Sequence, residues 1–290
     1  MGSLPTSLRQ NCEELLEVSI SSVEQVSGGD INRASLLRCS RGNYFLKYNS
    51  APRAAEMFRT EANGLRALAD PGLIKIPKIV GRGKAGEGYA FLILEHIEQG
   101  HPSPSFWRDF GSSLARLHQC TAESFGFLED NFIGSLPQSN GRHDDFIDFY
   151  MAERIEPQLS LAIDSGKMPV DVKNSFDQLY QKLSDIIPDE KAALIHGDLW
   201  SGNFLADIHS RPVLIDPSVC YAHREMDLGM SRLFGGFHAQ FYQSYHAEYP
   251  LEKGWENRID IFQLYYLLVH VNLFGGGYTN SVNRILAKYS

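Results

Sequence analysis

The chain has 290 residues, of which 43% are hydrophobic, and its 27 basic and 35 acidic side chains give a formal net charge of −8. This composition supports a large buried core, which excludes a disordered chain, and the acidic balance argues against nucleic-acid or anionic membrane partners. No run of 18 apolar residues and no secretion signal occurs. We therefore expect a cytoplasmic protein, with a monomer as the default because the sequence does not specify an oligomeric state.

Short strand-like runs separated by turns dominate the N-terminal third. Near-helical spacing of apolar residues predicts a first helix within residues 4–20, and a second helix over 53–69 stops at Asp70-Pro71-Gly72. The runs that indicate strands are 23–26, 34–39, 43–48 and 89–94. This order predicts a small antiparallel sheet accompanied by helices.

Helical patterns dominate the rest of the chain. Apolar residues on one face predict a helix that begins near Phe106, and further helices are expected over 146–161, 170–187 and 259–274. The exception is a polar loop between two brief apolar runs, 192–195 and 212–215. Glycine and prolines over 98–104 indicate a hinge. We therefore predict an α+β protein of two lobes, a sheet-containing lobe over 1–97 and a helical lobe over 98–290.

The four cysteines, Cys12, Cys39, Cys120 and Cys220, are widely scattered and form no C-x-x-C pair. This distribution fits neither a zinc site nor a disulfide framework, so we expect reduced thiols. A buried strand position explains Cys39 better than redox sensing does.

The polar loop contains the pattern with the clearest chemistry. Asp198 and Asn203 are five positions apart, and Asp216 follows an apolar strand 13 positions later. Phosphoryl transfer needs a carboxylate to accept the proton of an attacking hydroxyl and oxygen ligands for magnesium. Asp and Asn also form ordinary turns, but their spacing from the second Asp favours catalysis. We predict Asp198 as the base and Asn203 and Asp216 as metal ligands.

The segment His196-Gly197-Asp198-Leu199-Trp200-Ser201-Gly202-Asn203 is similar to the catalytic loop of the protein-kinase-like superfamily in its aminoglycoside phosphotransferase and choline kinase branch. Together with 221–229 and 232–237, it resembles the fructosamine kinases, also called ketosamine or ribulosamine 3-kinases. The resemblance implies a kinase-like fold that uses ATP and Mg²⁺. It also implies transfer to the 3-hydroxyl of a ketosamine, after which the adduct falls apart and the glycated amine is repaired.

A lysine and a glutamate upstream test this resemblance independently. Strand alternation places Phe45 and Lys47 on one face of the 43–48 run, where a lysine on a partly buried surface needs an anionic partner. Glu61 interrupts an apolar helical stripe that contains Met57 and Leu65, where a charge is costly unless paired. We predict a Lys47–Glu61 pair; in kinases such a lysine also contacts the nucleotide phosphates.

Other nucleotide contacts are implied by position in the resembling family. Gly28 and Gly29 lie where a kinase covers the phosphates, although adjacent glycines equally suit a plain hairpin turn. Backbone groups of Glu95, His96 and Ile97, at the end of a strand, would contact adenine.

The remaining site residues flank the catalytic loop. His196 and Asp227 are expected to support the loop rather than to touch the substrate. Trp200 could stack on a sugar-like acceptor or plug the C-terminal lobe, and we favour the acceptor. The resemblance over 221–229 places His223 and Arg224 with the substrate residues.

Two alternatives remain open at this stage. One is a kinase whose acceptor is an aminoglycoside, choline or a similar hydroxyl compound. The other is a nucleotide-binding scaffold without activity, which is disfavoured because Asp198 is present and a scaffold needs no base. The sequence does not reveal which ketosamine is preferred.

Overall fold

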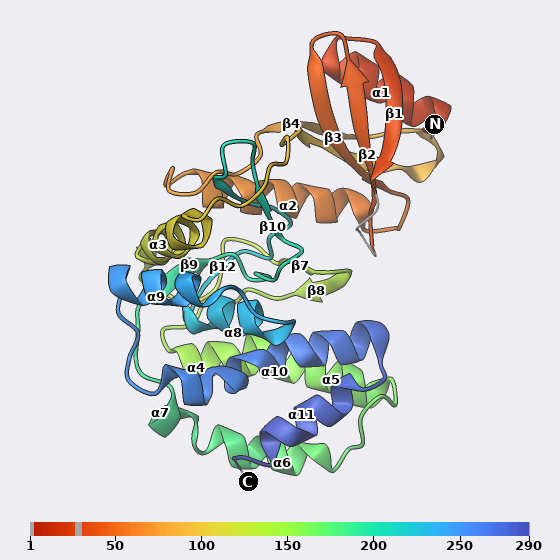
Figure 1. Cartoon of the computed structure of the whole chain (residues 1–290). Coiled ribbons are helices and arrows are strands. Elements are labelled where there is room, and N and C mark those ends of the chain that lie inside the picture. Colours follow the sequence, from red (N-terminus) through yellow and green to blue (C-terminus); the bar gives the residue numbers. More distant parts are fainter. Residues whose placement is uncertain (1–2, 27–30, 290) are drawn as a thin grey trace. The chain divides into compact units, whose positions relative to one another are not determined.

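The computed structural model describes residues 3–26 and 31–289, which form two compact units (Figure 1). The first unit consists of the chain up to Phe106 together with Gly202–Pro217, and the second consists of Trp107–Ser201 and Ser218–Ser290. The expected single boundary after residue 97 is therefore replaced by a division in which a later segment joins the first unit. Gly28 and Gly29 lie outside the described residues.

A five-stranded antiparallel sheet in the order β1-β2-β3-β5-β4 forms the centre of the first unit. Its strands are β1 (Ile20–Val26), β2 (Arg33–Cys39), β3 (Gly42–Asn49), β4 (Ile79–Lys84) and β5 (Ala90–Glu95), with a short 3₁₀ turn η1 (Gly86–Gly88) before β5. Because β3 is the central strand, its side chains are enclosed by neighbours on both sides.

Two helices pack on opposite faces of this sheet. Leu46 and Tyr48 of β3 join a core that includes Leu8 and Cys12 of α1 (Thr6–Leu16). Lys47 points the other way and meets α2 (Ala54–Ala69). The alternation predicted for this strand is thereby confirmed.

The segment that returns to the first unit is a hairpin of β10 (Phe204–Ala206) and β11 (Pro212–Leu214). Its backbone bonds to the chain near Lys75 and Gly100, which explains why it belongs with the N-terminal residues. The buried Asp207 braces the turn by accepting hydrogen bonds from Arg211 and Lys75.

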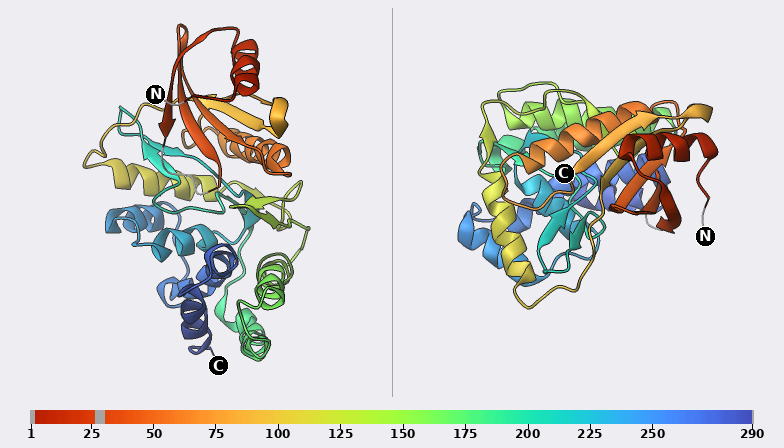
Figure 2. Two further views of the ribbon diagram at one scale, coloured as in Figure 1. Left: turned by 90° about the vertical axis from the view of Figure 1, so that its right-hand side faces the viewer. Right: turned by 90° about the horizontal axis from the view of Figure 1, so that it is seen from above.

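The second unit is mainly helical. Its helices are α3 (Phe106–His118), α4 (Phe146–Phe149), the π-helical turn η2 (Tyr150–Ile155), α5 (Glu156–Asp164), α6 (Val172–Tyr180), α7 (Leu183–Ile186), α8 (Glu225–Leu233), α9 (Ala239–Glu248), α10 (Trp255–Phe274) and α11 (Tyr278–Leu286). The long helix α10 packs against α5, α8 and α11, and the left panel of Figure 2 shows α10 and α5 end-on, side by side. Most of α10 is buried, as its nearly continuous apolar sequence requires.

Small sheets complete the second unit. Strands β6 (Thr121–Ala122), β9 (Ala192–Ile195) and β12 (Cys220–Ala222) pair in the order β12-β9-β6, and β7 (Asn131–Ile133) pairs with β8 (Leu136–Gln138). The predicted catalytic loop begins where β9 ends. A buried central strand therefore carries that loop.

Several element boundaries differ from those expected. The first helix ends at Leu16 because Ile20 already begins β1. The region 146–161 is continuous but contains a π turn, and the expected helix over 170–187 is divided into α6 and α7. Side-chain periodicity does not detect such changes of backbone hydrogen bonding.

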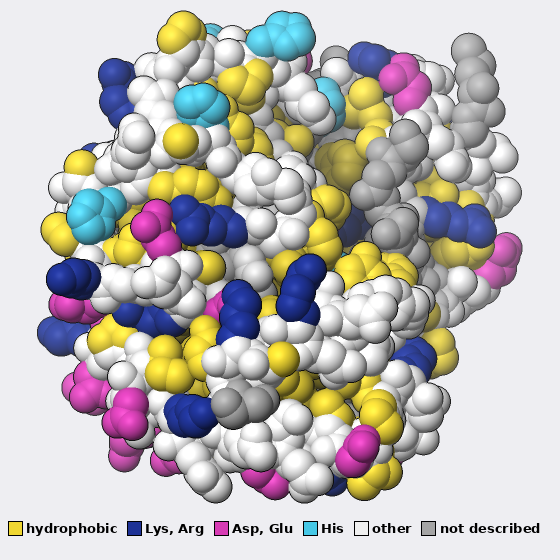
Figure 3. Space-filling view, turned by 60° about the horizontal axis from the view of Figure 1, so that its bottom comes forward, with side chains coloured by type: hydrophobic (Ala, Val, Ile, Leu, Met, Phe, Trp, Pro, Cys, Tyr) yellow, Lys and Arg dark blue, Asp and Glu magenta, His cyan; other side chains and the backbone are white. Residues whose placement is uncertain are grey.

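The surface over the C-terminal helices shows hydrophobic side chains scattered among charged ones (Figure 3). Val170, Leu161 and Phe274 are exposed in this unit, which is ordinary for isolated apolar side chains. Although α10 has 20 residues, neither it nor any other helix in residues 3–26 and 31–289 has the length and apolarity needed to cross a membrane.

Candidate active site

A buried ion-pair cluster lies in the first unit, between β3, α2 and the end of β11. Lys47 Nζ donates to Glu61 Oε1 at 2.7 Å and to Asp216 Oδ1 at 2.9 Å. The Lys47 and Glu61 side chains are nearly enclosed, whereas 46% of the Asp216 side chain is exposed. The cluster therefore has one open side, at Asp216.

Opposing effects determine the protonation of this cluster. Burial lowers the pKa of Lys47, but the charges of Asp216 and Glu61 outweigh burial and hold that pKa above its ordinary value. Burial, helped by the Asp216 charge, raises the pKa of Glu61 despite the nearby ammonium. Lys47 is consequently a cation at neutral pH.

The backbone around Asp216 is unusual. Its φ of 53° lies in the left-handed region, which is uncommon for a residue other than glycine and which Asp tolerates better than most. Nearby, the Ile215 amide donates to the Asn203 carbonyl at 3.1 Å, and Asn203 Nδ2 donates to the Asp216 carbonyl at 3.4 Å. These contacts hold the two predicted metal ligands next to each other.

The chemistry of these residues fits a magnesium ion. Two carboxylates share a single lysine, so the cluster has one negative charge in excess. Mg²⁺ prefers oxygen ligands and is usually held by one or two carboxylates together with substrate phosphates and water. Accordingly, the described ranges contain no group of three or more His, Cys, Asp or Glu side chains that would form an all-protein metal site.

The second unit holds the first part of the catalytic loop on β9. The Asp227 carboxylate of α8 accepts from the backbone amides of His196 and Gly197, both at 2.8 Å. Its Oδ2 also lies 3.2 Å from the buried His118 ring. Burial raises the pKa of Asp227, but these donors outweigh burial and lower it. In this geometry an ionised carboxylate fixes the loop backbone just before Asp198.

Gly197 occupies a position that no other residue fits. Its φ is +82°, and a Cβ at this position would lie 2.0 Å from the carbonyl oxygen of Ser218. The same tight approach allows the Ser218 amide to donate to the His196 carbonyl at 2.9 Å. The glycine in the His-Gly-Asp sequence is therefore required by backbone packing.

Neighbouring residues of the loop differ in burial. Leu199 is fully buried, while Asp198 is partly exposed and 38% of Trp200 is exposed. The indole of Trp200 meets Phe234 edge-on at 6.3 Å between ring centroids. Leu199 thus anchors the loop, and Trp200 keeps an accessible surface.

The structure gives no support for substrate contacts by His223 and Arg224, because both are buried. Arg224 donates to both carboxylate oxygens of Glu190 at 2.7 Å and stacks over Tyr249. The His223 ring stacks on Phe262. We assign both residues to the scaffold that positions α8. Glu190 is missed by sequence reasoning because it lies in a polar segment with no periodic signal.

The expected adenine-binding segment follows β5. Glu95 is the last residue of the strand, and its amide bonds to the Lys78 carbonyl. The backbone groups of His96 and Ile97 make no hydrogen bond to residues 3–26 or 31–289. They are available to a base, so their adenine contacts remain a prediction.

Comparisons with known proteins agree with this geometry. The family model for fructosamine kinase matches residues 6–290. The chain belongs to the fructosamine kinase family. A protein of Enterococcus faecium assigned as a ketoamine kinase is 38% identical over 266 residues, which cover 91% of this chain and 94% of that protein. The chloroplastic protein-ribulosamine 3-kinase of Arabidopsis thaliana is 38% identical over 275 residues, covering 93% and 83%.

Solved structures show the same fold. One from Thermobifida fusca, assigned as a fructosamine-3-kinase, has a TM-score of 0.88 and 31% identity, with 98% of each chain covered. An aminoglycoside phosphotransferase solved with ADP and hygromycin B has a TM-score of 0.65 and 20% identity, with 97% of this chain and 98% of that chain covered. The predicted α+β, kinase-like fold is thereby confirmed.

Proposed function

We propose that this protein transfers the γ-phosphoryl group of ATP to the 3-hydroxyl of a ketosamine, a fructosamine or ribulosamine adduct, and so acts in the repair of glycated amines. The observation that carries the proposal is the Lys47–Glu61–Asp216 cluster, found in a member of the fructosamine kinase family. It provides a fixed cation next to an accessible carboxylate, as phosphate binding with a metal requires.

Each side chain has a defined role in the proposed reaction. Lys47, held in place by Glu61, binds the nucleotide phosphates and offsets their charge. Asp198 orients the acceptor hydroxyl and accepts its proton as the oxygen attacks the γ-phosphorus. Asp227 keeps the backbone before Asp198 in place. Trp200 offers an apolar face to the sugar carbons.

Asn203 and Asp216 would hold magnesium, which when bound neutralises phosphate charge. The excess negative charge of the cluster supports this role, since a net acidic protein otherwise repels a nucleotide. The ADP complex of an aminoglycoside phosphotransferase with the same fold also supports nucleotide use.

The test is ADP release by the purified protein with ATP, magnesium and a panel of fructosamines, ribulosamines, aminoglycosides and choline. We expect turnover of ketosamines and a loss of about 10²–10⁴-fold in kcat for Asp198→Asn. Asp164→Asn, at an exposed carboxylate of α5, is the matched control and retains activity. Undiminished turnover by Asp198→Asn, or turnover of aminoglycosides or choline alone, refutes the proposal.

A further inference from the structure

A network of buried amide side chains joins the β7–β8 hairpin to the chain just before β12. Asn131 and Gln138, one from each strand of the hairpin, are both more than nine-tenths buried. Asn131 Nδ2 donates to the Val219 carbonyl at 2.8 Å, and Gln138 Nε2 donates to the Ser218 carbonyl at 3.1 Å. The Ser218 hydroxyl donates to the Phe132 carbonyl at 2.8 Å. The hairpin therefore holds the chain before β12 by three hydrogen bonds.

The orientation of the amides in this network follows from Arg154 of η2, because a guanidinium has donors and no acceptor. Arg154 is fully buried and donates to Asn140 Oδ1 at 2.7 Å. The Asn140 amide nitrogen therefore points the other way, where it donates to Asn131 Oδ1 at 3.0 Å. Gln138 Nε2 donates to the same Asn131 oxygen at 2.8 Å. With its oxygen turned toward these two donors, Asn131 presents its nitrogen to the chain before β12.

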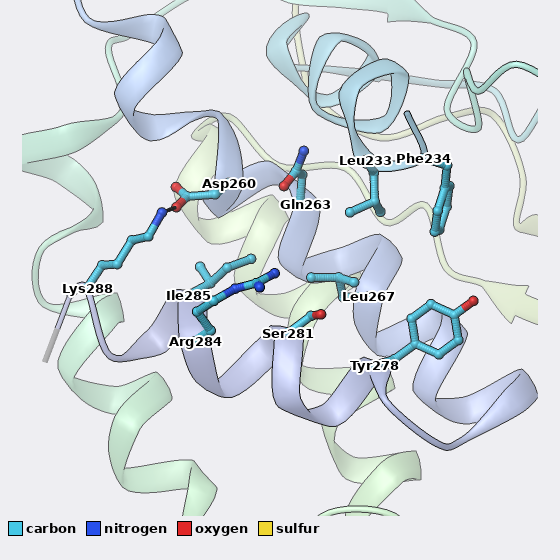
Figure 4. A pocket seen from close by; sticks show the side chains of 10 residues that line it. All are labelled: Leu233, Phe234, Asp260, Gln263, Leu267, Tyr278, Ser281, Arg284, Ile285 and Lys288. Carbon is cyan, nitrogen blue, oxygen red and sulfur yellow. Dashed lines mark hydrogen bonds and ion pairs between the residues drawn. The ribbon is translucent and has the colours of Figure 1, made fainter. Parts of the chain in front are cut away.

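Tyr265 of α10 fixes the oxygen of the Gln138 amide. Its hydroxyl donates to Gln138 Oε1 at 2.6 Å. Gln263 and Leu267 line a pocket on another side of α10 (Figure 4). Tyr265 is two residues from each of them, or about 200° around the helix, so it leaves α10 on the side away from that pocket. Gln138 thus has partners for its oxygen and for both hydrogens of its nitrogen, which gives its amide a single orientation.

The residue that Gln138 holds also packs against the catalytic loop. The Ser218 amide donates to the His196 carbonyl at 2.9 Å. The Ser218 carbonyl faces Gly197, where an added Cβ would lie 2.0 Å from its oxygen. The same carbonyl therefore meets Gln138 on one side and Gly197 on the other. Because this contact is close-packed, a displacement of Ser218 displaces the backbone that carries Asp198, the next residue of the loop.

We infer that Gln138 is a positioning residue for Asp198: it fixes the Ser218 carbonyl and, through it, the backbone at Gly197. The inference rests on the proposed function, in which Asp198 is the base. The Asp227 carboxylate holds the amides of this backbone from α8, and the amide network holds it from the hairpin. Both supports are needed for reactive geometry, because a small misplacement of a catalytic group lowers kcat strongly.

Gln138→Met tests the inference, because methionine has a similar shape but offers no donor to the Ser218 carbonyl. We expect kcat with a ketosamine to fall about ten- to a hundredfold. KM for ATP should stay within about twofold of wild type, since Lys47 and Glu61 belong to the other unit. Tyr265→Phe removes one hydroxyl and leaves the donor of Gln138 in place, so it should lower kcat only about threefold.

Gln158→Met is the matched control. Gln158 is a similarly buried amide, whose Oε1 accepts from Asn272 at 2.9 Å between α5 and α10, outside the network. Its loss should lower the free energy of unfolding and leave kcat unchanged. Hydrogen–deuterium exchange gives a second measurement that does not depend on turnover. The amides of His196 and Gly197 should exchange about fivefold faster in Gln138→Met than in wild type, and at the wild-type rate in Gln158→Met.

An unchanged kcat in folded Gln138→Met overturns the inference, as does a loss of kcat equal to that in Gln158→Met. Either result leaves the proposed function intact. If Gln138→Met does not fold, Tyr265→Phe replaces it, and wild-type kcat and amide exchange in that variant overturn the inference. Absence of turnover with every ketosamine by wild type is a different result. It refutes the proposed function, while amide exchange still shows whether Gln138 holds the loop.

Discussion

The Lys47 cluster of the first unit and the Arg224–Glu190 pair of the second unit both join acidic and basic side chains, but they differ in how far those side chains are exposed. In the first unit Lys47 is shared by two carboxylates, and one of these, Asp216, is partly exposed. In the second unit Arg224 pairs with the Glu190 carboxylate and also donates to the backbone carbonyls of Tyr249 and Pro250. A cluster with an excess charge and an exposed carboxylate indicates a ligand site. A buried pair whose two charges balance indicates a structural role.

The largest expected difference between the two clusters appears when both members of an ion pair are replaced together, Lys47 with Glu61 or Arg224 with Glu190. Removing a whole buried pair often changes the free energy of unfolding little, so activity can be measured on folded protein. We expect Lys47→Met/Glu61→Gln to lower kcat/KM for ATP at least about a thousandfold, because phosphate charge is no longer offset. The check is steady-state ADP release beside a urea unfolding curve.

Arg224→Met/Glu190→Gln is the matched control for that double variant. It should keep activity within about fivefold of wild type, since neither side chain touches the substrates in our assignment. A comparable loss of activity in both folded double variants would contradict the distinction between the two clusters.

The single variant Arg224→Met tests the scaffold role. It leaves Glu190, which is largely buried, without its guanidinium, and breaking such a pair costs about 3–5 kcal/mol in the free energy of unfolding. Burial lowers the pKa of Arg224, but Glu190 more than compensates and raises it, so the arginine is charged in the folded protein. Chemical denaturation measures the loss, and adding Glu190→Gln should recover most of it.

His223, which is fully buried, makes stability depend on pH. Burial, with help from the charges of Arg224 and Arg258, lowers its pKa to about 4. Below about pH 6.5 the His223 ring of the unfolded chain binds a proton, whereas in the folded protein it stays neutral down to about pH 4. The free energy of unfolding therefore falls as the pH falls. The full loss is on the order of 3 kcal/mol.

His223→Asn should remove that part of the pH dependence. Asn keeps an acceptor for the Glu225 amide, which donates to His223 Nδ1 at 3.2 Å. Urea unfolding of wild type and variant at pH 7.5, 6.0, 5.0 and 4.5 makes the comparison. Parallel curves of stability against pH for the two proteins would show that His223 contributes nothing.

The smallest expected effect concerns Trp200. If its exposed face stacks on the acceptor, Trp200→Leu raises KM for the ketosamine about fivefold, a contribution of about 1 kcal/mol, and leaves KM for ATP unchanged. If the indole instead plugs the second unit, the same change lowers the free energy of unfolding and leaves both KM values unchanged. Kinetics and denaturation of the one variant decide between them.

The sequence predicts some of these features because local rules determine them. Alternation along a central strand places Lys47 and Leu46 on opposite faces of the sheet. The apolar stripe around Glu61 requires a cationic partner for that buried carboxylate. The apolar runs on either side of the catalytic loop are equally easy to recognise in the sequence, and β9 spans the predicted residues 192–195.

Other features depend on partners that no local pattern reveals. The resemblance over 221–229 places Arg224 with the substrate residues, yet the carboxylate that it meets in the fold, Glu190, lies 34 residues earlier in the chain. The edge strand β4 escapes prediction because Gly81 and Gly83 interrupt its apolar pattern. The roles of Asp198, Asn203 and Asp216 stay predictions until ADP release is measured.

The return of Gly202–Pro217 to the first unit has a consequence for dissecting the protein. The polypeptide passes between the units three times, after Phe106, Ser201 and Pro217, so no single cut yields both units intact. A fragment ending at Phe106 would lack Asn203 and Asp216, and Lys47 would keep only Glu61 as its partner. Truncation after the first unit's N-terminal part therefore does not produce a minimal nucleotide-binding domain.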